Sequence, residues 1–123
     1  MIRSLALSLA VAAFAAMIAA APAVSQDTPK GDASAGQKVF LADGCYECHG
    51  RVGEGGAMNG PAPILAKTKL PYAAFVGQLR NPANDMPPYP TNLLSDQQAA
   101  DIFAYLQSLS GPRRVSDLPI LND

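Results

Sequence analysis

The sequence has only two cysteines and one histidine among its 123 residues, and this scarcity limits the chemistry that it can perform. A structural zinc site usually needs four cysteine or histidine ligands, and only three such residues are present. No second histidine is available as a base, and no Ser-His-Asp arrangement supports nucleophilic catalysis. The 9 basic and 10 acidic residues form no basic run, so the chain has no feature of a nucleic-acid-binding protein.

No segment alternates apolar and polar residues well enough to predict a β-strand. Eleven prolines and ten glycines predict long loops and a thin core, which a buried cofactor would complete. The predicted fold class is therefore all-α, with three to four helices and long loops.

Three segments carry helix signals. Residues 32–43 begin with Asp32 as a candidate N-cap and end before a glycine, and Gly36 inside this helix suggests that another backbone crosses close by. Residues 71–80 begin with a proline in the first turn. Residues 95–109 begin with the capping box Ser95 to Gln98, and their apolar positions form one continuous stripe.

The N-terminal segment, residues 1–25, has the features of a cleavable signal peptide. Arg3 precedes an apolar run from Leu5 to Ala21, and small residues allow cleavage after Ala23 or Ser25. We expect a mature domain at residues 26–110, an extended C-terminal tail at residues 111–123 and a periplasmic location. If the segment is not cleaved, the protein is anchored in the membrane.

The pattern Cys45-Tyr46-Glu47-Cys48-His49 is the attachment signature of a c-type haem. Two thiols add to the porphyrin vinyl groups as thioethers, and the adjacent imidazole reaches the iron. The sequence thus predicts one covalently bound haem c held by Cys45 and Cys48, with His49 as an iron ligand. A thioredoxin-like redox pair, part of a zinc site and a short structural disulfide remain as alternatives.

These features together resemble the class I c-type cytochromes, specifically the small bacterial periplasmic proteins with a single haem. The resemblance covers Gly31 to about Leu109 and includes the haem motif after an N-terminal helix, the pair Gly60-Pro61 and the sequence Met86-Pro87-Pro88. It implies a cytochrome c fold wrapped around the haem.

The resemblance also assigns residues around the iron. Met86 matches the family's second axial ligand. A neutral thioether suits low-spin iron and raises the reduction potential relative to a second histidine. Met58 is the competing methionine. Pro61 matches the proline whose backbone carbonyl accepts a hydrogen bond from His49.

The haem propionates would need hydrogen-bond donors or positive charge around them. Tyr72 and Arg80 are the preferred candidates, chosen without a spacing rule. The other candidates are Arg51, Lys67, Lys69 and Asn92.

The implied function is single-electron transfer between redox proteins, without catalysis, because His49 and Met86 leave no open position on the iron. A second hypothesis is a dedicated haem subunit of a periplasmic dehydrogenase complex, docked through the apolar tail. A third is a haem peroxidase or gas sensor, in which Met86 is displaced. The expected partners are a dehydrogenase, an oxidase or a reductase.

Overall fold

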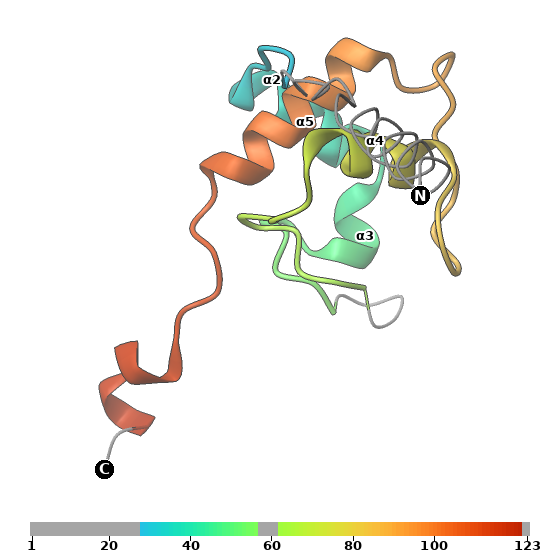
Figure 1. The fold of residues 1–123 in the computed structure, drawn as a ribbon. Coiled ribbons are helices and arrows are strands. Elements are labelled where there is room, and N and C mark those ends of the chain that lie inside the picture. The colour runs from blue at the N-terminus through green and yellow to red at the C-terminus, as the bar shows by residue number, and fades with distance from the viewer. Residues whose placement is uncertain (1–27, 57–61, 122–123) are drawn as a thin grey trace, which may run out of the picture.

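The computed structural model describes residues 28–56 and 62–121, which form four α-helices and two short 3-10 helices (Figure 1). The α-helices are α2 (Ala33–Ala42), α3 (Cys45–His49), α4 (Tyr72–Arg80) and α5 (Asp96–Ser108), and the 3-10 helices are η1 (Val115–Asp117) and η2 (Pro119–Leu121). These two ranges contain no strand, so the all-α prediction is confirmed.

Helices α2 and α5 cross in close contact and form the largest helix pair of the fold (Figure 1). Gly36 lies at the crossing, where a Cβ atom would overlap the backbone carbonyl of Asp101. One turn later, Phe40 packs against Tyr105 with their ring centroids 5.6 Å apart. The predicted close approach of a second backbone at Gly36 is confirmed.

The helix ends match the sequence signals closely. The side chain of Asp32 accepts a hydrogen bond from the backbone N–H of Ala35 and caps α2. Ser95 and Gln98 form the predicted capping box at the start of α5. Pro71 precedes the first residue of α4 and does not belong to the helix. The motif between α2 and α4 adds a short helix, α3, that helical periodicity did not reveal.

The core lies between α5 and the two helices that it contacts, α2 and α4. Phe75 and Phe103 join α4 to α5, with ring centroids 5.2 Å apart. Asp101 is buried in α5, where its carboxylate accepts hydrogen bonds from the backbone N–H of Asp32 and from the side-chain amide of Gln97. The buried cluster comprises Phe40, Phe75, Leu79, Leu94, Ala99, Ile102, Phe103, Tyr105 and Leu106.

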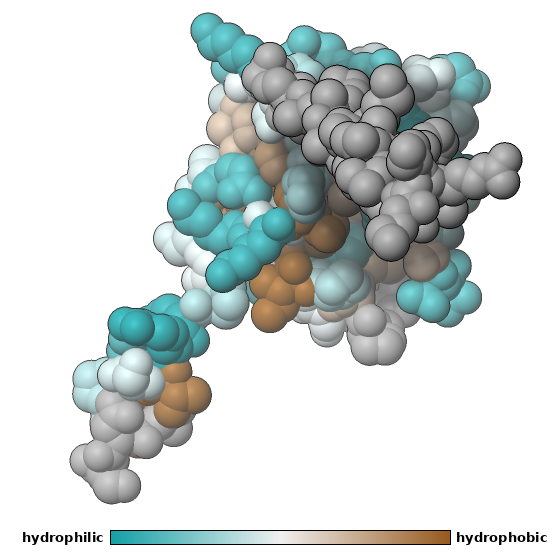
Figure 2. Space-filling model, in the orientation of Figure 1, coloured by the Kyte–Doolittle hydropathy of each residue, from teal (hydrophilic) through white to brown (hydrophobic). Residues whose placement is uncertain are grey.

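The C-terminal tail extends away from the helices after α5 (Figure 1). Within the described residues, η1 and η2 contact each other and no other helix. Val115 and Ile120 are 64% and 83% exposed, and Figure 2 shows the tail as a separate lobe with an apolar patch. No helix in the described part of the chain is long and apolar enough to cross a membrane. The predicted signal peptide, residues 1–25, lies outside the described residues.

Candidate haem site

Helix α3 presents the two cysteines on one side of a single turn. Its N-cap is Gly44, whose φ of 75° is a left-handed conformation that glycine adopts easily. Cys45 and Cys48 are three residues apart, so their side chains lie on the same face of the helix. Both are half-buried free thiols and form no disulfide with each other. The pair therefore fits attachment of one planar ligand at two points.

His49 ends this helix and is buried, with 8% of its surface exposed. Its Nδ1 atom lies 3.0 Å from the carbonyl oxygen of Pro63. A carbonyl can only accept a hydrogen bond, so Nδ1 carries a proton, and in the neutral imidazole the free lone pair is on Nε2. This is the tautomer that a metal ligand bound through Nε2 requires.

The described residues give His49 a different acceptor from the one predicted from the sequence. Pro61, the predicted acceptor, lies outside the described residues, and the structure gives the contact to Pro63. Backbone hydrogen bonds fold the segment back on itself: Leu65 and Ala66 both donate to the carbonyl of Gly53. This fold brings the carbonyl of Pro63 to the imidazole.

Two glycines permit this folded loop. Gly53 and Gly55 have φ angles of 67° and 76°. A Cβ atom at Gly53 would lie 2.9 Å from the backbone nitrogen of Ala66, and one at Gly55 would lie 2.9 Å from the carbonyl oxygen of Ala62. Gly55 also donates its N–H to the carbonyl of His49 at 2.8 Å. The glycines predicted to mark a loop therefore fix the path of the segment that positions His49.

The environment of Cys45 argues against the alternative of a redox-active pair. Burial, reinforced by the negative charge of Asp43, raises the pKa of the Cys45 thiol to about 11. A catalytic cysteine needs the opposite shift, toward a reactive thiolate at neutral pH. The described residues contain no group of three or more histidine, cysteine or acidic side chains that could hold a metal ion.

Met86 lies in the loop between α4 and α5, half-buried against the core. The side-chain amide of Gln78 donates a hydrogen bond to its sulfur at 3.7 Å. The competing residue Met58 lies outside the described residues, so the choice between the two methionines stays a prediction.

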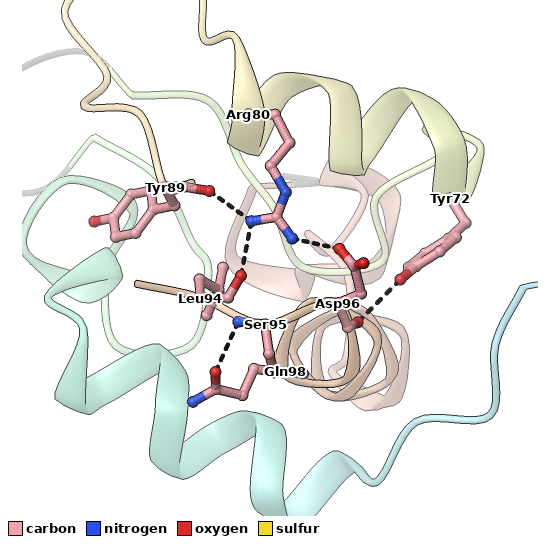
Figure 3. Close-up of polar contacts among 7 residues, drawn as sticks. All are labelled: Tyr72, Arg80, Tyr89, Leu94, Ser95, Asp96 and Gln98. Atoms are coloured by element: carbon pink, nitrogen blue, oxygen red, sulfur yellow. Dashed lines mark hydrogen bonds and ion pairs between the residues drawn. The ribbon is translucent and has the colours of Figure 1, made fainter. Parts of the chain in front are cut away.

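Arg80 and Tyr72, the two propionate candidates, both contact the start of α5 (Figure 3). The guanidinium of Arg80 donates to the carbonyl oxygens of Tyr89 and Leu94 and forms an ion pair with Asp96 at 2.6 Å. The hydroxyl of Tyr72 donates to the backbone carbonyl of Asp96 at 3.4 Å. These contacts give both residues a role within the protein, and their assignment to the propionates stays a prediction.

The residues around the motif fit a haem. Buried His49 offers its Nε2 atom, Cys45 and Cys48 offer free thiols, and Met86 offers a soft sulfur. Several apolar side chains pack against the core on one side while keeping part of their surface exposed, as expected where a large apolar ring completes the interior. They are Tyr46, Leu65, Val76 and Tyr89.

Three contributors to the site were not identified from the sequence. Pro63 acts through its backbone carbonyl and Gln78 through a single amide, and neither type of contact leaves a pattern in the chain. Tyr89 donates its hydroxyl to the carbonyl of Asp43, just before the haem motif. Burial raises the pKa of this phenol to about 12. The sequence signal that could have identified Tyr89 is its place in the proline-rich segment just after Met86.

Comparison with known protein families matches residues 31–106 to the family described as Cytochrome C oxidase, cbb3-type, subunit III. The match includes the haem motif, Met86 and all four α-helices but for the last two residues of α5. No curated protein and no solved structure matches the chain.

Proposed function

This chain belongs to the c-type cytochrome family of cbb3-type oxidase subunit III, and on that premise we propose that it carries single electrons between redox proteins. In this proposal one haem c is attached to Cys45 and Cys48 and ligated by His49 and Met86. Membership of the family supports haem-based electron transfer, and the two axial ligands are the finer part of the proposal.

The observation that carries the proposal is the contact between His49 Nδ1 and the Pro63 carbonyl. It orients the ring, places a proton on Nδ1 so that Nε2 is the nitrogen that would bind a metal, and makes the imidazole a stronger donor. A bound haem supplies the one-electron ferric/ferrous couple. Met86 supplies a neutral sulfur that favours the ferrous state, so we expect a higher potential than with a second histidine. Because His49 and Met86 would both ligate the iron and leave no open position on it, we propose a carrier and not an enzyme.

Absorption spectroscopy of the intact protein tests this proposal. The protein is produced in a periplasm with haem-attachment machinery, and spectra are recorded oxidised, reduced and after addition of carbon monoxide. We expect a low-spin c-type spectrum with the weak red band of a methionine-ligated ferric iron, unchanged by carbon monoxide. A high-spin spectrum, or one that carbon monoxide changes, would instead favour a haem peroxidase or gas sensor in which Met86 is displaced.

We propose a periplasmic location from the N-terminal sequence. Arg3, the apolar run after it and the small residues up to Ser25 support export and cleavage. The mass of the protein recovered from the periplasm tests this: cleavage after Ala23 or Ser25 gives two distinct masses. Recovery of the uncleaved chain in the membrane fraction would contradict it and establish an anchored protein.

A second candidate function is a dedicated haem subunit of a larger redox complex, such as a periplasmic dehydrogenase complex. The exposed Val115 and Ile120 favour it, because apolar side chains on an extended tail gain stability when a partner covers them. A cavity of about 150 Å³ adjoins the start of the tail, lined by Val52, Glu54, Ile64, Ala66, Ser110, Gly111 and Pro112. Deleting residues 111–123 tests this role: unchanged association with the partner enzyme would defeat it.

A further inference from the structure

The loop that carries Met86 is closed at its base by backbone contacts. Helix α4 ends at Arg80, and the chain then passes through Met86 to Tyr89. The N–H of Tyr89 donates to the carbonyl oxygen of Leu79 at 2.8 Å, so the two ends of the loop meet. The position of Met86 therefore depends on what holds Tyr89.

Arg80 holds the far end of this loop (Figure 3). Its Nη1 atom donates to the carbonyl oxygen of Tyr89 at 2.5 Å and to that of Leu94 at 2.8 Å. The Nη2 atom pairs with the Asp96 carboxylate at 2.6 Å. The Arg80 side chain is only 16% exposed, whereas that of Asp96 is 77% exposed. A charged donor with little access to water makes strong hydrogen bonds to these carbonyls.

Tyr89 extends the connection to the haem motif. Its hydroxyl donates to the backbone carbonyl of Asp43 at 3.1 Å, and Asp43 is separated from Cys45 by Gly44 alone. A continuous set of contacts thus runs from Asp96 in α5 through Arg80 and Tyr89 to the segment that enters α3. It joins the loop carrying the predicted sulfur ligand to the helix carrying the predicted nitrogen ligand.

We propose that Arg80 is a positioning residue that keeps the Met86 sulfur available to the iron. This inference rests on the proposed function, since it requires Met86 to be an axial ligand. Arg80 restrains the conformations of the loop from Asn81 to Pro88, so fewer of them place the sulfur away from the iron. The fork of the guanidinium matters, because a lysine cannot donate in the same fixed geometry to two carbonyls and a carboxylate.

The affinity of added imidazole for the ferric iron of the holoprotein measures this restraint, because imidazole competes with the Met86 sulfur. A loop that opens more often gives an added ligand easier access, and the apparent dissociation constant is inversely proportional to the fraction of molecules in which the loop is open. We expect Arg80→Gln to bind imidazole at least tenfold more tightly than wild type and to show a weaker red band. Asp96→Asn and Arg80→Lys should give smaller changes in the same direction.

Lys38→Gln is the matched control, because it removes one positive charge from the exposed face of α2 and should leave imidazole affinity unchanged. Wild-type affinity and a full red band in Arg80→Gln would overturn the proposal. If that variant yields no holoprotein, unchanged imidazole affinity in both Arg80→Lys and Asp96→Asn would overturn it. Absence of the red band from the wild-type protein would instead refute Met86 ligation, a separate failure that belongs to the proposed function.

Discussion

The Nδ1 atom of His49 and the carbonyl oxygen of Pro63 are 3.0 Å apart, and this contact joins the haem motif to a loop fourteen positions further along the chain. The loop reaches His49 because Gly53 and Gly55 adopt positive φ angles, which residues with a side chain adopt only at a cost. Any substitution that shifts this loop should therefore also change the orientation of the His49 imidazole.

The first prediction concerns Gly53→Ala. The new Cβ atom would lie 2.9 Å from the backbone nitrogen of Ala66, at a φ of 67°. We expect the free energy of unfolding to fall by about 1–3 kcal/mol, measured by denaturant titration of the holoprotein.

Gly77→Ala is the control for this change. Gly77 lies within α4, and a Cβ atom there meets nothing within 4 Å. Alanine is the better helix former, so we expect the free energy of unfolding to rise by about 0.5–1 kcal/mol. Equal effects of the two substitutions would contradict our account of the loop.

The helices could be predicted from the sequence because their signals are local. The predicted helix ends agree with the structure to within a residue or two, because they depend on local capping residues such as Asp32 and Ser95. The close approach of a second backbone to α2 was also indicated, since a glycine such as Gly36 inside a helix is costly unless something approaches it.

The partners within the site could not be predicted, because they depend on the path of long loops. Pro61 and Pro63 differ by two positions in the sequence, yet only the folded backbone determines which carbonyl faces His49. The assignment of Arg80 to a haem propionate stays a prediction, whereas its contacts with Tyr89 and Leu94 join segments that no periodicity connects.

The second prediction concerns the covalent attachment. Cys45→Ser combined with Cys48→Ser should abolish haem that survives denaturation, because both thioether bonds are lost. Haem staining after denaturing electrophoresis measures this. Either single substitution should leave one bond and retain part of the signal, and full staining of the double variant would refute the assignment of these cysteines.

The third prediction separates the two methionines. Met86→Ala should retain covalent haem, lose the red band, lower the reduction potential and allow carbon monoxide to bind the reduced protein. Met58→Ala is the matched control and should change none of these properties. The reverse result would identify Met58 as the axial ligand.

The fourth prediction concerns the amide of Gln78, which donates to the Met86 sulfur at 3.7 Å. A donor on the sulfur withdraws electron density from it and so favours the ferrous state, provided that Met86 ligates the iron. Gln78→Leu should therefore lower the reduction potential. The change should be at most about 40 mV, because a neutral hydrogen bond is worth about 1 kcal/mol and about 59 mV corresponds to 1.4 kcal/mol for one electron.

The control for Gln78→Leu is Gln78→Glu, which keeps the length of the side chain but replaces the amide donor by a carboxylate. Both variants lose the donor, and the added negative charge favours the ferric state further. Redox titration should thus give the order wild type, then Gln78→Leu, then Gln78→Glu, from the highest potential to the lowest. A higher potential in Gln78→Leu than in wild type would show that the amide does not act on the sulfur in this way.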